Sequence, residues 1–259
     1  MFRFLPTTIN HFISLIGLTL MIVPVWIIFA SSTHTSLFIN THGLQFFLGD
    51  SFKENYSSVL FKKSGFFQEI TALKMFFNSF VMAMGIATLS VVTSLMAAYG
   101  LVYFKIKYAT FVFWLIFVTL LVPLELRVMP TYVVMSKLNF LNSFAGLIVP
   151  ISASAIATFF FRQFYKSIPE ELLEAAKLDG TNSWKFFIDF LVPLSKTMIA
   201  AVFIFMFVYG YNQYLWPLIM TTTEEYWTVV MGLKTMYGSI SHRFAFVIMS
   251  MIPPVLIII

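Results

Sequence analysis

The sequence has no cysteine and little charge. None of its 259 residues is a cysteine, which excludes disulfides, thiolate metal sites and thiol nucleophiles. Charged residues make up 10% of the chain, against roughly 25% in typical soluble domains. The 16 Lys and Arg and the 11 Asp and Glu are scattered between apolar runs, without the basic stripe that a nucleic-acid backbone requires. An ordinary soluble domain and a nucleic-acid-binding protein are therefore both excluded.

The sequence also lacks a recognisable set of catalytic residues. The four histidines, His11, His34, His42 and His242, are dispersed, and neither a His-Glu-x-x-His motif nor an Asp-rich calcium loop occurs. A polytopic membrane enzyme would need His, Asp or Glu gathered at one membrane depth, and the sequence offers no such group. We therefore expect a non-catalytic protein that holds no metal and no cofactor.

Apolar residues are what the chain has in abundance. They make up 59% of it, aromatic residues make up 19%, and the mean hydropathy is +0.89. A spanning helix needs about 20 mostly apolar residues to cross roughly 30 Å of hydrocarbon. Six stretches qualify, at residues 10–31, 75–102, 109–131, 144–165, 192–214 and 244–259. The sequence predicts an all-α polytopic membrane protein with six transmembrane helices in a single domain, residues 1–259, whose core is 75–259.

The sixth predicted span is short. From Phe244 to Ile259 it would cover about 16 residues, or roughly 24 Å at about 1.5 Å per residue. We therefore expect the last helix to be truncated.

The distribution of Lys and Arg over the short connections predicts the orientation. Slightly more of them fall on the side of the amino terminus, which favours a cytoplasmic amino terminus. Residues 32–74, the longest hydrophilic connection, are then extracytoplasmic and hold room for one or two short helices. Residues 166–190 are cytoplasmic.

The 166–190 connection predicts a helix, a turn and a second helix. Ser167 and Glu170 have the spacing of a capping box, and Gly180 suits the left-handed position that ends a helix. Thr181 or Asn182 can cap the helix that follows. From these features alone the segment is either a connector packed on its own protein or a docking helix for a partner.

One spacing in this connection is that of a known family. Glu174-Ala175-Ala176, three residues, Gly180, nine residues, Phe190, one residue and Val192-Pro193 together resemble the signature loop of ABC importer permeases. Phe190 and Val192 stand where the family has isoleucine and leucine. The resemblance implies that the loop is the coupling helix that sits in a cleft of the ATP-hydrolysing subunit. The coupling residues it implies are Glu171, Glu174, Ala175, Ala176, Asp179, Gly180 and Pro193.

The same resemblance implies the partners and the location. An ABC importer permease forms half of a heterodimeric pore with a second permease subunit. A dimer of ATP-binding subunits drives it, and a periplasmic or extracellular substrate-binding protein supplies the substrate. The expected location is the lipid bilayer of the bacterial inner (plasma) membrane, and no nucleic acid takes part.

Other segments resemble the carbohydrate-uptake group of these permeases, over about residues 77–218. They are residues 159–165 (FFFRQFY) and 211–217 (YNQYLWP), although the group usually has Trp at position 211. Within the group, residues 123–130 (PLELRVMP), 152–155 (SASA) and Asn212-Gln213 most resemble permeases for sn-glycerol-3-phosphate. The expected substrate is this phosphate ester, and another sugar or polyol is the alternative. A secondary transporter is disfavoured because inverted repeats are not evident and Glu125 is the sole candidate for a buried coupling carboxylate.

Four polar residues in or near the spans are candidates for the substrate pathway: Glu125, Arg127, Asn212 and Gln213. Arg127 could bind an anionic phosphate, with Glu125 holding it in place, and Pro123 and Pro130 could break the helix on both sides. The competing interpretation is that both ions are interfacial anchors. The two amides either bond between helices or offer donors to the substrate.

Overall fold

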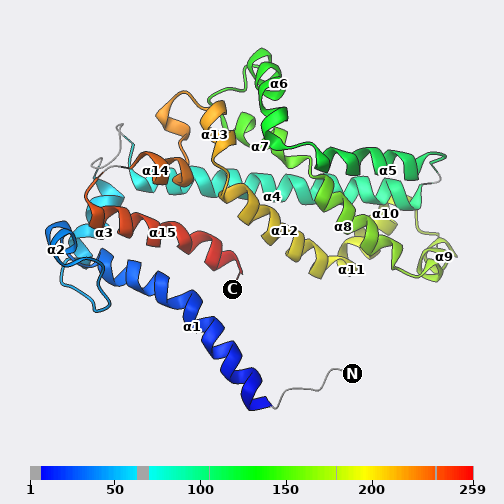
Figure 1. Cartoon of the computed structure of the whole chain (residues 1–259). Helices are drawn as coiled ribbons and strands as arrows, with labels where there is room; N and C mark the ends of the chain where they lie inside the picture. The colour runs from blue at the N-terminus through cyan, green and yellow to red at the C-terminus, as the bar shows by residue number, and fades with distance from the viewer. Residues whose placement is uncertain (1–6, 63–69, 105, 179, 237, 259) are drawn as a thin grey trace. The chain divides into compact units, whose positions relative to one another are not determined.

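The computed structural model describes residues 7–62, 70–104, 106–178, 180–236 and 238–258. These residues form helices and no strand (Figure 1). The helices are α1 (Thr7–Ser32), α2 (Ser36–His42), α3 (Phe52–Phe61), α4 (Ala72–Tyr103), α5 (Ala109–Val118), η1 (Thr119–Leu121), α6 (Leu124–Lys137), α7 (Phe144–Ser152), α8 (Ala155–Lys166), α9 (Glu170–Leu178), α10 (Ser183–Phe186), η2 (Phe187–Leu191), α11 (Val192–Leu194), α12 (Lys196–Tyr211), α13 (Leu215–Met220), η3 (Glu224–Tyr226), α14 (Val229–Thr235) and α15 (Ile240–Ile258).

Three of the described helices are long and apolar enough to cross a membrane singly: α1, α4 and α15. Three further candidates are pairs of shorter helices that bend at a break. The bend is 105° between residues 109–121 and 125–137, 44° between α7 and α8, and 74° between residues 183–194 and α12. The all-α polytopic fold is confirmed, and the count of six spans is reached if each bent pair is one crossing.

The predicted span over 109–131 is broken near Pro123, as expected. The chain leaves α5 through the 3₁₀ turn η1, and Val122 then takes an extended conformation ahead of Pro123. Proline disfavours the helical conformation in the residue before it, so the helix ends there and α6 starts in a new direction. Pro130, expected to cause a second break, lies inside α6.

The fourth and fifth predicted spans are also interrupted. Ala153 and Ser154 separate α7 from α8, and the Ser154 hydroxyl caps α8 by accepting from the Ala157 amide at 3.2 Å. The fifth bends at Ser195, whose hydroxyl donates to the Leu191 carbonyl at 2.6 Å. The sixth, α15, begins at Ile240 rather than near Phe244 and has 19 residues.

The described helices belong to two compact units. The first contains Met1–Phe76 and Met231–Val255, and the second contains Phe77–Val230 and Leu256–Ile259. In the first, the 32–74 connection folds into α2 and α3, and Ser36 bonds Ser241 at the start of α15 at 2.6 Å. Tyr56 on α3 shares a 2.8 Å hydrogen bond with Ser32. Burial raises the pKa of Tyr56, and that hydrogen bond partly opposes the rise.

The second unit is a bundle in which α8 packs against both α5 and α12 (Figure 1). α12 also approaches α4 closely, because a Cβ on Gly210 would lie 3.3 Å from the Ala83 Cα atom. Buried hydroxyls join α8 to α4, where Thr158 donates to Ser94 at 3.2 Å. This bundle holds the elements from which a pathway could be built.

Candidate transport cavity and coupling loop

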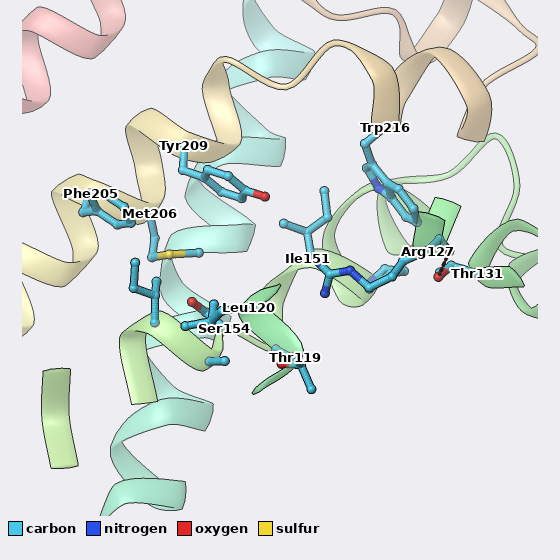
Figure 2. A pocket seen from close by; sticks show the side chains of 14 residues that line it. Thr119, Leu120, Arg127, Thr131, Ile151, Ser154, Phe205, Met206, Tyr209 and Trp216 are labelled. Atoms are coloured by element: carbon cyan, nitrogen blue, oxygen red, sulfur yellow. Dashed lines mark hydrogen bonds between the residues drawn. The ribbon is translucent and has the colours of Figure 1, made fainter. Parts of the chain in front are cut away.

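The second unit contains a cavity of about 230 Å³ among its interrupted helices (Figure 2). Its walls come from η1, α6, the break between α7 and α8, α12 and α13. The lining residues are Thr119, Leu120, Arg127, Thr131, Pro150, Ile151, Ala153, Ser154, Ala155, Ile156, Phe205, Met206, Tyr209 and Trp216. Non-helical backbone at membrane depth is tolerated where it is buried in protein or lines a cavity, and transporters place substrate sites at such discontinuous helices.

Arg127 is the only ionisable side chain other than tyrosine among these lining residues. Figure 2 shows it reaching into the cavity from α6, with the Tyr209 hydroxyl pointing inward from the α12 side. The first turn of α8, at Ala155 and Ile156, lines the same space. A helix amino terminus carries partial positive charge. The cavity is therefore electropositive.

Hydroxyl groups supply the remaining polarity of the cavity. Thr119, Thr131 and Ser154 donate to or cap nearby backbone: Thr131 donates to the Arg127 carbonyl at 2.7 Å, and Thr119 to the Ile116 carbonyl at 2.6 Å. Trp216 is buried and fixed by its indole N–H, which donates to the Leu147 carbonyl at 3.2 Å. The cavity thus combines one cation, several hydroxyls and an apolar wall.

Glu125 is placed apart from Arg127. It lies in the first turn of α6, is exposed and does not line the cavity. Residues two positions apart on a helix do not face each other, and the described residues show no ion pair between the two. The expected restraint of Arg127 by Glu125 therefore has no contact to support it.

Asn212 and Gln213 end a helix instead of lining the cavity. The Asn212 amide donates to the Val208 carbonyl at 2.9 Å, and the Gln213 amide donates to the Tyr209 carbonyl at 3.2 Å. The last carbonyls of a helix have no partner within it, so these amides satisfy the carboxyl end of α12. Within the described part of the chain, neither side chain bonds to another helix and neither lines the cavity.

Sequence reasoning missed Tyr209 and Trp216 as cavity residues, and Ser154 as well. Tyr209 lies inside an apolar run, and Trp216 has the pattern of an interfacial belt residue. Ser154 carried a signal, since a serine four residues after Pro150 can start a new helix. Which helix faces meet is decided by the bends, and of these only the break at Pro123 was predicted.

The predicted helix, turn and helix over 166–190 are present. α9 covers Glu170–Leu178, Gly180 has φ +72°, and Asn182 caps α10 by accepting from the Lys185 amide at 2.8 Å. The capping box at Ser167 is wrong. The Ser167 hydroxyl donates back to the Phe164 carbonyl at 2.7 Å and so belongs to the end of α8.

α9 has one face free of its own chain. Glu171, Glu174, Ala175 and Leu178 recur at helical spacing and are exposed, with Leu178 89% exposed, while Ala176 is buried. We call these four residues the docking stripe. Asp179 lies outside the described residues, and Pro193 is exposed in α11.

The segment after the turn is anchored to the bundle. The Tyr99 hydroxyl on α4 donates to the Ser183 carbonyl at 2.7 Å, and its ring lies 4.9 Å from that of Phe187. The loop is therefore joined directly to α4, a long helix of the second unit.

A bundle of apolar and interrupted helices around an electropositive cavity, with a helical loop offering a free face, defines a membrane transport subunit. The model of the family described as "Binding-protein-dependent transport system inner membrane component" matches residues 90–259. The chain belongs to this family. It is a multi-pass inner-membrane permease subunit of an ABC importer and not an enzyme, and the described residues contain no group of His, Asp and Glu that could hold a metal.

Relatives extend the similarity over nearly the whole chain. The sn-glycerol-3-phosphate transport system permease protein UgpE of Brucella melitensis is 38% identical over 257 residues, covering 97% of this chain and 91% of the relative. The proteins of the same name from Rhizobium meliloti and Yersinia enterocolitica are 37% and 38% identical, covering 99% and 96% of this chain and 93% and 90% of theirs.

A solved structure shares the fold. It is a chain from the crystal structure of a bacterial ABC transporter involved in the import of the acidic polysaccharide alginate. The TM-score is 0.77 with 21% sequence identity, and the match covers 100% of this chain and 97% of that one.

Proposed function

We propose that this chain is one of two membrane-spanning subunits of an ATP-driven importer for sn-glycerol-3-phosphate. The observation that carries the proposal is Arg127, the single cation in the wall of a cavity built from interrupted helices. The name shared by the relatives from Brucella, Rhizobium and Yersinia supports the same substrate.

The chemistry of the cavity suits a small phosphate ester. A guanidinium can bind two phosphate oxygens at once, and the amino terminus of α8 adds positive potential in the same space. The hydroxyls of Ser154 and Tyr209 can bond the glycerol part of the substrate. In this proposal Arg127 binds the phosphate, and Ser154 and Tyr209 take the role first expected of Asn212 and Gln213. Glu125 is close to Arg127 in the sequence, but in this proposal it takes no part in binding the phosphate.

Energy enters through the 166–190 loop. In this proposal the docking stripe sits in a cleft of the ATP-binding subunit, and closure of the two ATP-binding subunits pushes α9. Gly180 sets the angle between α9 and α10, and Tyr99 passes the movement to α4. Glu171, Glu174, Ala175, Ala176, Asp179, Gly180 and Pro193 are the coupling residues.

The remaining partners follow from this role. A second permease subunit completes the pore, and a substrate-binding protein delivers ligand on the face opposite the ATP-binding subunits. The amino terminus and the 166–190 loop lie in the cytoplasm, and residues 32–74 lie outside.

The test is uptake of labelled sn-glycerol-3-phosphate by vesicles carrying this chain with the subunits encoded beside it, with ATP inside and the binding protein added. Maltose serves as the comparator. ATP-dependent uptake of the phosphate ester alone is the expected result. Uptake of maltose or of a polyol instead would keep the importer and discard the phosphate role of Arg127, and no uptake of any of them by an assembled complex would overturn the proposal.

A further inference from the structure

The 32–74 connection carries a stretch of large apolar side chains that the first unit leaves uncovered. Residues 44–48 read LQFFL, and Leu44, Phe46, Phe47 and Leu48 are 59%, 53%, 81% and 56% exposed. We call this stretch the aromatic loop. It contains no charged residue, and the next one along the chain is Asp50. A contiguous apolar patch of this kind on a protein surface marks a contact with a partner or a membrane.

The aromatic loop is held against the carboxyl-terminal part of α1. The Trp26 indole N–H donates to the Phe46 carbonyl at 2.9 Å, and the backbone N–H of Gln45 donates to the Ser31 hydroxyl at 2.9 Å. The rings of Trp26 and Phe46 meet edge to face with centroids 6.4 Å apart.

Two further bonds hold the end of the loop and the glycine that follows it. His34 Nε2 lies 3.0 Å from the Phe47 carbonyl, and the Gly49 amide donates to the Thr33 hydroxyl at 2.7 Å. Non-helical backbone can sit at membrane depth only when its polar groups have such partners. Trp26 and Ser31 of α1, with Thr33 and His34 just after it, supply several of them here, so the loop is held beside the end of the helix.

The position of Trp26 sets the depth of the loop. Trp26 lies six residues before Ser32, the end of α1, which is about 9 Å along a helix at about 1.5 Å per residue. α1 is a candidate membrane span, and no part of its apolar window is buried inside the chain. The Phe46 carbonyl is therefore level with a residue inside the last two turns of a spanning helix, at the depth where Trp typically anchors in the bilayer interface.

We propose that the aromatic loop is a membrane anchor: Leu44, Phe46, Phe47 and Leu48 insert into the boundary between lipid headgroups and acyl chains at the carboxyl-terminal end of α1. The occupant of the patch is lipid, because the patch continues the apolar surface of a spanning helix and has aromatic residues but no charge. Apolar side chains of such interfacial elements lie about 5–10 Å into that boundary. The anchor helps to fix the depth and the rotation of α1, together with the contacts that the end of this helix makes with α3, such as the hydrogen bond between Ser32 and Tyr56.

The absence of native cysteine permits a direct test of depth. Phe47→Cys would carry a nitroxide label in the full chain, reconstituted into vesicles of phosphatidylethanolamine and phosphatidylglycerol. Lys53→Cys, exposed on α3 in the same unit, is the aqueous control, and Leu18→Cys, exposed in the middle of α1, is the acyl-chain control. Leu48→Cys repeats the measurement at a second position in case Phe47→Cys disturbs the fold.

Collisions with oxygen and with a water-soluble nickel complex report the depth. We expect the labels at 47 and 48 to have oxygen-to-nickel collision ratios at least fivefold above that at 53 and below that at 18. A ratio at 47 and 48 equal to that at 53 would place the loop in water and overturn the proposal. Protection from both reagents would show that protein covers the loop, and this also would overturn it.

Discussion

Arg127 is the one charged side chain among the residues that line the cavity. The other lining residues are apolar or carry only hydroxyls, so an anion that enters meets one guanidinium and the positive end of α8. No carboxylate among the lining residues competes with it. In the proposed role, this single positive charge attracts the phosphate without the multiple contacts that would hold it too tightly for release.

Arg127→Gln should reduce uptake of sn-glycerol-3-phosphate by about 10–100-fold, because a charge-assisted hydrogen bond contributes about 1.5–3 kcal/mol. Uptake should be measured at several substrate concentrations in vesicles. Arg243→Gln, which removes an exposed arginine of α15, is the matched control and should have little effect. Equal losses from the two variants would show that Arg127 acts only as an interfacial anchor.

Asn142 organises the turn between α13 and η3. It has φ +53°, and its side-chain oxygen accepts from the Thr222 and Thr223 amides at 2.6 and 3.1 Å. Asn139 also has a positive φ, of +57°, and the structure gives its side chain no such role.

Asn142→Ala should therefore lower the free energy of unfolding by about 1–2 kcal/mol more than Asn139→Ala, since both lose the left-handed preference but only the first loses these bonds. Thermal unfolding in detergent is the measurement. If the two variants unfold at the same temperature, the backbone conformation and not the hydrogen bonds holds this turn.

Gly180 is required for its backbone conformation and not for space. A Cβ at this position would meet no atom within 4 Å, yet φ is +72°. Gly180→Ala should cost about 1–2 kcal/mol at the turn and tilt α9, so ATP-driven uptake should fall severalfold or more while membrane insertion is kept. Gly180→Asn should retain more uptake because asparagine tolerates this conformation. Gly17→Ala, in open space within α1, is the control, and unchanged uptake by Gly180→Ala would argue against the coupling role.

At the scale of elements, α9 is distinguished by how little of it the chain itself covers. Ala176 is buried, whereas the docking stripe, with its two carboxylates and Leu178, is exposed. Leu178, 89% exposed, leaves apolar surface that the chain itself does not cover. In the proposed mechanism the ATP-binding subunit covers this face.

Leu178→Ala and Glu174→Lys should each weaken binding of the ATP-binding subunit at least tenfold and lower uptake in proportion, through lost apolar burial and reversed charge. Co-purification of the ATP-binding subunit with the membrane complex measures the binding. Leu194→Ala, an exposed leucine on α11, is the control. Full binding by both stripe variants would show that α9 packs on its own protein or serves another role.

At the scale of the whole molecule, the proposed orientation puts the aromatic loop and the docking stripe on opposite faces of the membrane. Alkaline phosphatase, which is active only outside the cytoplasm, should be active when fused after residue 50 and inactive when fused after residue 182. A green fluorescent protein at the same two sites should give the reverse pattern. Phosphatase activity at 182 but not at 50 would invert the orientation.

Many of the helices and turns could be predicted from the sequence because interactions between residues close in the chain determine them. Hydropathy alone located α1, α4 and α15, and Gly180 predicted the turn after α9 because only a residue without Cβ adopts that conformation freely. The family signature is also local, because it depends only on the spacing of residues within 174–193. The early start of α15 and the reversed bonding of Ser167 show that helix ends are less well determined than helix centres.

What the tertiary structure decided is where the interrupted helices meet. Pro123 signals a break, but the 105° turn that brings Arg127 into the cavity, and leaves Glu125 out of it, depends on tertiary packing such as that of α6 against α13. The same holds for Tyr209, which lies in an apolar run and shows no distinctive pattern. The sequence also places the aromatic loop in a hydrophilic connection, and only the contacts of Trp26 and His34 with it show that it lies beside the end of α1. A sequence records the preference of each segment for helix or lipid. Contacts between segments far apart in the chain decide which side chains share a cavity or a surface.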